Sequence, residues 1–167
     1  SCSVPIVSCN IHCTGTHTEC ISHIQDSKFK ITDKCPRGLI PSYLITVETV
    51  AANSIEDSYH CDFSSSNVVS KEAIKSKIST PCESLIIRTL PNDESKLSRN
   101  YDDVSAPFLT SDAMDHINQL GVKHLLVDLP SIDKADDGGV LGNHRSFFNK
   151  GDTISELLYI PNDLLDG

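Results

Sequence analysis

Residues 12–23 read HCTGTHTECISH, and they hold three of the chain's seven histidines together with two thiols and a carboxylate. An extended strand would place Cys13, His17 and Glu19 on one face, because side chains along a strand alternate with a period of two. A straight helix would instead turn His17 and Glu19 about 200° apart. Gly15 stands between two threonines, which argues against a helix interior. The pattern therefore predicts a loop or strand end whose side chains surround a cation.

The mixture of side chains in this segment indicates a metal or catalytic site rather than an ordinary polar loop. Imidazole, thiolate and carboxylate groups are the protein ligands of zinc and other divalent ions, and here they fall within a few residues of one another. Seven cysteines are an odd number without a regular framework, and no CxxC pair occurs, which speaks against a zinc ribbon. Most of them are expected to be buried small hydrophobic residues, with Cys13 and Cys20 as the exceptions.

The overall composition limits the classes of partner and compartment. The 167 residues carry 14 Lys and Arg against 23 Asp and Glu, a formal net charge of −9, which disfavours nucleic acid because phosphate binding needs concentrated cationic side chains. No apolar run is long enough to span a bilayer, and the first residues do not form a cleavable signal, so we expect no membrane contact. A chain of this size does not need disulfides, which favours the reducing cytoplasm. The length predicts one domain, 1–167.

Strand and helix signals alternate along the rest of the chain. Strands are expected in the segments rich in apolar and β-branched residues, 1–9, 44–50, 85–90, 124–130 and 154–161, the last with Glu156 at its start. Helices are expected in the two capped amphipathic segments, 70–78 and 110–121. This order predicts an α/β fold with buried parallel strands, whose carboxyl ends are where sites are built. The intervening segments 51–67, 91–107 and 131–149 are expected to be loops. Segment 91–107 is expected to be either a substrate lid or a solvent-exposed surface loop.

The opening segment resembles the motif of the cyclase family, which includes bacterial kynurenine formamidases and isatin hydrolases. That motif is His-x-Gly-Thr-His-x-Asp-x-Pro-x-His, and residues 13–23 align with it without a gap. The residues that match it are Gly15, Thr16, His17 and His23. The departures are Cys13 for the first histidine, Glu19 for the aspartate and Ile21 for the proline.

Two downstream segments extend the resemblance over residues 12–161. Residues 128–133, DLPSID, are similar to the family's Asp-x-Pro-Ser-x-Asp segment, and His144 and Glu156 have the separation of its last two site residues. The resemblance implies a compact α/β domain of the swivelling β/β/α type, with a curled mixed sheet packed on helices. Family members usually carry more strand-forming residues at both ends, so the chain is expected to be trimmed there or completed by a partner chain, and a homodimer is expected.

The resemblance also implies an activity, namely a metal-dependent hydrolase of a small amide, a formamide (an arylformamidase) or a cyclic amide. It assigns four residues as metal ligands, His17, Glu19, His144 and Glu156, and one as the general acid and base, His23. The alternatives for His23 are a fourth ligand or a structural hydrogen-bonding residue. The metal is expected to be a single ion of zinc, with manganese as the alternative. At the position of the first histidine, three alternatives stay open: Cys13 binds as a zinc-favouring thiolate, His12 swings in, or neither binds.

Several roles around this centre also have alternatives. Asp128 and Asp133 either orient ligand imidazoles or cap turns, and the pocket lining is expected to come from 91–107, Phe147 and Phe148. A non-catalytic relative, with its ligand set eroded at positions 13, 19 and 21 and a binding role, is the alternative function. A thiol enzyme that uses Cys13 or Cys20 beside a histidine is the third possibility.

Overall fold

The computed structural model describes residues 3–167, apart from the side chains of Cys13 and Asp103. Its centre is a five-stranded mixed sheet in the order β1-β8-β7-β5-β2. These strands are β1 (His17–Glu19), β2 (Ser42–Glu48), β5 (Ser84–Leu90), β7 (His124–Val127) and β8 (Thr153–Glu156). The last four are mutually parallel, and β1 alone runs antiparallel, against β8. The mixed α/β class predicted from the sequence is confirmed.

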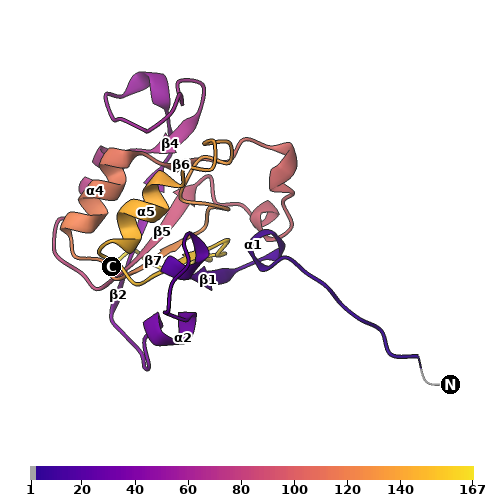
Figure 1. Cartoon of the computed structure of the whole chain (residues 1–167). Coiled ribbons are helices and arrows are strands. Elements are labelled where there is room, and N and C mark those ends of the chain that lie inside the picture. The colour runs from indigo at the N-terminus through magenta and orange to yellow at the C-terminus, as the bar shows by residue number, and fades with distance from the viewer. Residues whose placement is uncertain (1–2) are drawn as a thin grey trace.

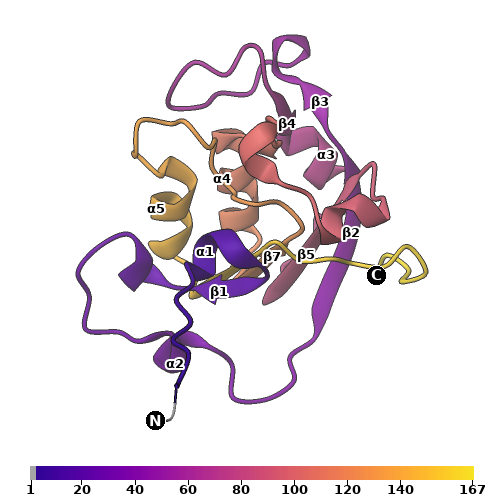
Figure 2. The same ribbon diagram turned by 90° about the vertical axis from the view of Figure 1, so that its right-hand side faces the viewer.

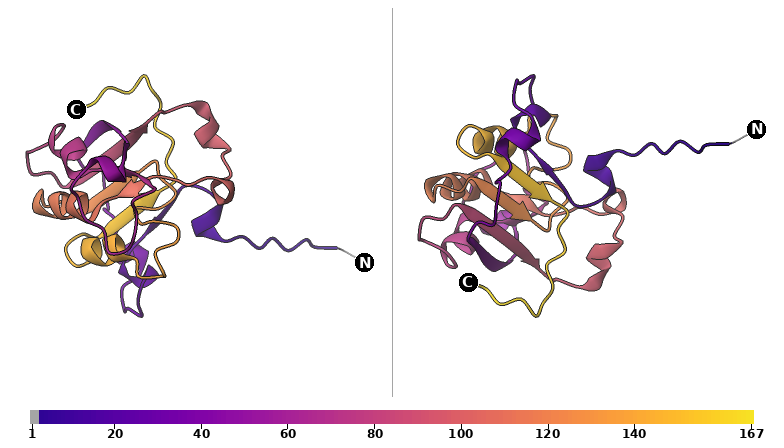
Figure 3. Two further views of the ribbon diagram at one scale, coloured as in Figure 1. Left: turned by 90° about the horizontal axis from the view of Figure 1, so that it is seen from above. Right: turned by 90° about the horizontal axis from the view of Figure 1, so that it is seen from below.

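Three helices pack together on one side of this sheet, as Figures 1 and 3 show. They are α3 (Lys71–Lys75), α4 (Ser111–Gln119) and α5 (Gly142–Phe148), and α4 contacts both of the others. The opposite side carries the short helix α1 (Ile11–Thr14) and segment 91–107, which contains the 3₁₀ helices η3 (Glu94–Leu97) and η4 (Tyr101–Asp103). Figure 2 shows α1 directly beside β1.

The core lies between the sheet and these helices and consists mainly of aliphatic side chains, as the composition predicts. Its largest fully buried members include Leu85, Ile87, Leu125, Ile154, Met114, Ile117 and Phe147. Each such side chain stabilises the fold by roughly 1.5–3 kcal/mol relative to an exposed position.

A second, smaller sheet has the order β3-β4-β6, made of β3 (Val50–Ala51), β4 (Asn67–Val69) and β6 (Phe108–Leu109). It encloses its own cluster of Ala52, Val68 and Phe108, on which Tyr59 packs. The remaining short elements are α2 (Ile31–Lys34), η1 (Ile21–His23) and η2 (Ala52–Ser54). Within residues 3–167, no helix has the length and apolar character needed to cross a bilayer.

The caps of the two predicted helices are confirmed. The hydroxyl of Ser70 accepts from the N–H of Ala73 at 3.2 Å, and that of Thr110 accepts from the N–H of Ala113 at 3.1 Å, so both supply the N-cap bond. Gly121 follows α4 with φ +79°, the left-handed conformation that commonly ends a helix at glycine.

Four expectations were wrong. Residues 3–9 form no strand but extend away from the body of the protein (Figure 1). A helical turn, α1, forms immediately before Gly15, because the side chain of Asn10 caps it by accepting from the N–H of His12 at 3.2 Å. The segment 131–149 contains α5, and Glu156 ends its strand rather than starting it.

Candidate metal centre

The antiparallel pairing of β1 and β8 brings the first members of the centre together. In this ladder His17 lies opposite Glu156, and Glu19 follows two residues further along β1. The intervening Thr18 is exposed, whereas His17 and Glu19 are both buried. The two-residue period predicted for this segment is therefore confirmed for His17 and Glu19, because successive side chains of a strand point to opposite faces.

Helix α5 adds His144 to the same point. Its Nε2 atom lies 2.8 Å from Oε1 of Glu19 and 3.4 Å from Oε1 of Glu156. His17 reaches the same carboxylates from β1, with Nε2 3.8 Å from Oε2 of Glu156 and 4.0 Å from Oε2 of Glu19. The structure thus brings together the four expected ligands His17, Glu19, His144 and Glu156. Each of their side chains is at most 5% exposed.

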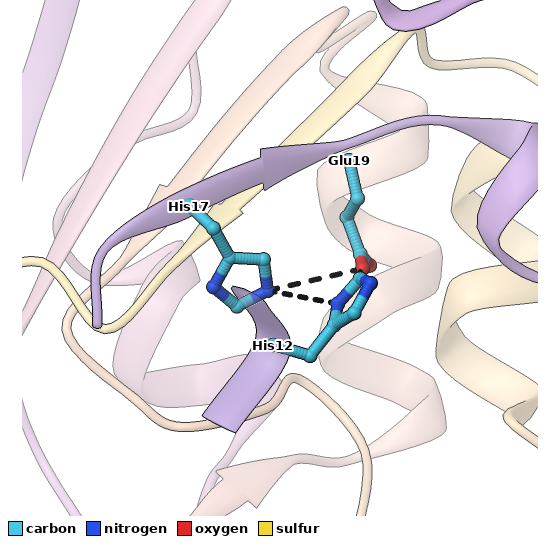
Figure 4. Close-up of side chains that lie close together, drawn as sticks. All are labelled: His12, His17 and Glu19. Atoms are coloured by element: carbon cyan, nitrogen blue, oxygen red, sulfur yellow. Dashed lines mark hydrogen bonds and ion pairs between the residues drawn. The ribbon is translucent and has the colours of Figure 1, made fainter. Parts of the chain in front are cut away.

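Two further histidines border this cluster. Nδ1 of His12, from α1, lies 3.2 Å from Oε2 of Glu19 and 3.1 Å from Nε2 of His17, as Figure 4 shows. Nε2 of His23, from η1, lies 3.4 Å from the same Glu19 oxygen, and the rings of His12 and His23 stack at 4.2 Å. The side chain of Cys13 lies outside the described residues, so its predicted role as a ligand stays a prediction.

Three polar atoms at the centre of the cluster have no hydrogen-bond partner among the described residues. Both carboxylate oxygens of Glu19 and Nε2 of His144 are buried, and within the described part of the chain they have no hydrogen-bond partner, even though they approach one another closely. Buried polar groups in folded proteins are nearly always paired, and an uncompensated buried carboxylate is costly. Imidazole nitrogens and carboxylate oxygens that converge in this way form the ligand set of a divalent cation such as zinc. The residues present therefore fit a metal ion.

The electrostatics of His144 lead to the same conclusion. Burial alone would lower its pKa, but the hydrogen bond with Asp133 and the nearby carboxylates of Glu156 and Glu19 raise the pKa to about 11. Burial likewise acts to raise the pKa of Glu19, and the neighbouring histidines, His144 foremost, outweigh it and lower that pKa. The site therefore favours positive charge strongly, and without a metal ion the carboxylates hold a proton on His144 that a divalent cation would displace.

Asp133 holds the imidazole of His144 in place. Its Oδ2 lies 2.7 Å from Nδ1 of His144 and also accepts from the backbone N–H of that residue at 3.0 Å. Its Oδ1 accepts from the N–H of Asn143 and from the hydroxyl of Tyr59 at 2.7 Å. Asp133 thus orients an imidazole and binds the first turn of α5 at once, which combines the two roles left open by the sequence.

Two other expectations for this region meet different outcomes. Asp128 does not orient an imidazole; it accepts from Nζ of Lys96 at 2.7 Å and from the backbone N–H of Thr89 at 2.8 Å. Tyr59 was not predicted from the sequence, because it lies in a polar segment whose local pattern gives no sign of a contact with Asp133.

A cavity of about 410 Å³ adjoins the cluster on the side of His12. Segment 91–107 supplies a large part of its lining, with Leu97, Arg99, Tyr101 and Val104 among the residues, which confirms that part of the prediction. Leu157, Leu158 and Tyr159, directly after β8, supply another part. Phe147 and Phe148 do not line it, contrary to expectation, because α5 directs both rings into the core.

The fold and the cluster define an α/β protein with a buried histidine–carboxylate centre suited to a divalent metal. The model of the Cyclase family, described as "Putative cyclase", matches residues 5–134, and the chain therefore belongs to this family. His144 and Glu156 lie beyond the matched residues, and it is the structure that places them at the centre.

Solved structures of the same fold share little sequence with the chain. A potential metal-dependent hydrolase with cyclase activity is 17% identical, with a TM-score of 0.61 over 96% of this chain and 68% of the other. A predicted metal-dependent hydrolase from Bacillus stearothermophilus is 18% identical, with a TM-score of 0.60 over 96% and 67%. An isatin hydrolase bound to the product analogue thioisatinate is 12% identical, with a TM-score of 0.58 over 93% and 63%. A search of curated proteins found no match.

Proposed function

We propose that the protein is a metal-dependent hydrolase of a small amide, a formamide or a cyclic amide. The observation that carries this proposal is the convergence of His17, Glu19, His144 and Glu156 on a buried point, where atoms of Glu19 and His144 find no hydrogen-bond partner among the side chains that the structure describes. Membership of the cyclase family and the likeness in fold to an isatin hydrolase support it.

The four converging side chains would hold one divalent ion, zinc or alternatively manganese. Such an ion lowers the pKa of water and polarises the carbonyl group under attack. Asp133 fixes the ring of His144 through Nδ1 and so keeps Nε2 directed at the carboxylates. The N–H of Ile132 donates to Oε1 of Glu156 at 2.8 Å and holds that carboxylate in a similar way.

His23 is the residue we assign to proton transfer. Its side chain is 27% exposed at the edge of the cluster, with Nε2 3.4 Å from Oε2 of Glu19. At that atom it accepts a proton from the attacking water and returns it to the nitrogen that leaves as the C–N bond breaks. The products are a carboxylic acid and an amine, and His23 ends in its starting protonation state.

The adjoining cavity sets the size of the substrate. Its volume is within the range of small-molecule sites, and its lining combines aliphatic side chains with Tyr101 and Tyr159. An apolar or aromatic amide fits this lining, with its reactive group toward the wall that contains His12.

We further propose that the protein works in the cytoplasm as a homodimer. Its unpaired cysteines suit a reducing compartment, and the described ones are Cys9, Cys20, Cys35, Cys61 and Cys82. Val4, Ile6 and Val7 are each at least 77% exposed and offer apolar surface to a second copy. A mass near 18 kDa in solution, measured by light scattering after gel filtration, would contradict the dimer.

Elemental analysis combined with one variant tests the catalytic proposal. We expect near-stoichiometric zinc or manganese in the purified chain, hydrolysis of formanilides or isatin-like lactams, and retention of the metal with loss of turnover in His23→Ala. The alternative function, a non-catalytic binding protein, is favoured by the departures at Cys13, Glu19 and Ile21 from the family motif. Protein that neither contains a metal nor binds one on reconstitution would support this alternative and overturn the enzyme proposal.

A further inference from the structure

We propose that His12, the residue before the motif's first position, is a ligand of the metal centre, so that every donor atom of the centre is nitrogen or oxygen. This inference rests on the proposed metal-dependent function. It selects one of the three alternatives that the sequence leaves open at this point of the motif.

The distances around His12 are those of three ligands on one ion. Nδ1 of His12 is 3.1 Å from Nε2 of His17 and 3.2 Å from Oε2 of Glu19, and these last two atoms are 4.0 Å apart. Bonds of about 2.0–2.1 Å from one ion place adjacent ligand atoms roughly 2.9–3.4 Å apart. In Figure 4 the three side chains point toward one another from α1 and β1. The spacing therefore matches a shared cation more closely than an arrangement of unrelated surface groups.

The helical turn of α1 explains why His12 reaches the centre. In an extended chain, the residue four positions before His17 would share its face, which is how the family motif is spaced. Residues 11–14 are helical here, so each side chain turns by about 100° from the one before it. Asn10 fixes where this turn starts by capping the N–H of His12, and Thr14 bonds the carbonyl oxygen of Asn10 through its hydroxyl. In this register it is the ring of His12 that faces His17 and Glu19.

Neighbouring rings hold His12 in this orientation. Its ring stacks on that of His23 at 4.2 Å and meets that of His17 edge-on at 4.8 Å. The side chain is still 39% exposed and forms part of the cavity wall. His12 would thus bind the ion on the side from which a substrate approaches, whereas His144 and Glu156 bind from the buried side.

A centre of imidazole and carboxylate donors has a distinct metal preference. A thiolate ligand selects strongly for zinc, whereas carboxylates also suit manganese. With His12 as the ligand, the chain should bind both ions, and the bound metal should show no sulfur neighbour.

Three single variants of the full chain, His12→Ala, Cys13→Ala and His17→Ala, test the inference. The affinity for zinc is measured by competition with a chromophoric chelator, and thermal unfolding shows that each variant is folded. We expect His12→Ala to weaken zinc binding by about tenfold or more, the scale of effects seen even for groups that only support a ligand. Cys13→Ala should change it by less than about threefold. X-ray absorption of the zinc-loaded protein should show nearest neighbours at about 2.0–2.1 Å and none at about 2.3 Å, the Zn–S distance.

The outcomes separate this inference from the function on which it rests. If Cys13→Ala loses the metal and His12→Ala keeps it, or if a sulfur neighbour is observed, His12 is not the ligand. If His17→Ala loses zinc while His12→Ala binds it normally, the centre exists but the imidazole of His12 only hydrogen-bonds to His17. If none of the three variants changes zinc binding, the proposed centre itself is wrong, and the inference falls with it.

Discussion

The hydroxyl of Tyr59 donates a 2.7 Å hydrogen bond to Asp133, whose other oxygen lies 2.7 Å from Nδ1 of His144. A residue from the loop between β3 and β4 of the smaller sheet is thereby connected to the inner side of the candidate metal centre. The backbone N–H of Lys134 donates to the same hydroxyl, and the ring of Tyr59 packs on Phe108 at 4.8 Å, so its position is fixed on two sides. Outer partners of this kind direct a ligand imidazole toward its metal.

Replacing this hydroxyl should weaken metal binding without unfolding the protein. In Tyr59→Phe the ring contacts remain, but Asp133 loses one donor and holds His144 less firmly. We expect the zinc affinity to fall by about tenfold, at the lower end of the range for such partners. Chelator competition measures the change, and Tyr43→Phe, at a site 42% exposed, is the matched control. Equal affinities for the two variants would contradict a role of Tyr59 at the centre.

The core makes a separate prediction about stability. Ile117 on α4 is fully buried against the sheet, so truncation to alanine removes buried methyl groups and leaves a cavity. Ile117→Ala should lower the free energy of unfolding by about 2–5 kcal/mol. Leu165→Ala, at a position 87% exposed, should change it by less than about 0.5 kcal/mol. Urea unfolding followed by circular dichroism measures both, and similar losses in the two variants would show that α4 is not packed as described.

Some features of the fold and of the candidate metal centre could be predicted from the sequence alone. The strands around residues 44–50, 85–90 and 124–127 could be predicted from runs of β-branched and apolar residues. Helix α4 could be predicted from the apolar side chains along one of its faces and from its N-cap, Thr110. His17 and Glu19 could be placed on one face because a strand has a fixed period of two. In each case a local rule and the tertiary environment agree.

The features that escaped prediction depend on contacts between distant segments. The helix α5 begins in a segment rich in Asp and Gly, and Asp133 stabilises its first turn by accepting from Asn143 and His144. Tyr59 meets Asp133 only because the smaller sheet places its loop there. The turn of α1 depends on the cap that the Asn10 side chain supplies. The sequence prediction gave more weight to Gly15, which argued against a helix. Spacing within one segment cannot reveal such partners.

One pH effect follows from the N-terminal turn of α4. Asp112 accepts from both the hydroxyl and the N–H of Ser58, and these bonds lower the pKa of its carboxyl below the ordinary value of 3.8. Because the folded pKa is lower than the unfolded one, the carboxylate stabilises the fold above about pH 4, and this stabilisation is lost as the pH falls through the folded pKa. Thermal midpoints of the wild type and Asp112→Asn should therefore differ at pH 6, and the difference should shrink as the pH falls below 3.8. A difference that persists unchanged at low pH would contradict the assignment, and Ser58→Ala should reduce the same pH-dependent difference.

The buried pair of Lys96 and Asp128 attaches the pocket-lining segment 91–107 to the end of β7. Nζ of Lys96 lies 2.7 Å from Oδ2 of Asp128 and also donates to the carbonyl oxygen of Thr89, and the two charged side chains are 5% and 0% exposed. Lys96→Met leaves the carboxylate of Asp128 buried without its cation, so the free energy of unfolding should fall by about 3–5 kcal/mol. The segment should also loosen. Under the proposed function this raises KM for an amide substrate more than it lowers kcat, because the segment lines the cavity but supplies none of the proposed metal ligands or proton-transfer groups.

The double variant Lys96→Met with Asp128→Leu decides whether the cost comes from the unpaired charge. Removing both partners eliminates the uncompensated carboxylate, so most of the lost stability should return, since a buried ion pair can be replaced by apolar side chains at little net cost. KM should stay raised, because the tie between segment 91–107 and β7 remains broken. A double variant as unstable as Lys96→Met alone would show that the unpaired charge is not the source of the loss, and that the bonds of both side chains to Thr89 stabilise the fold instead.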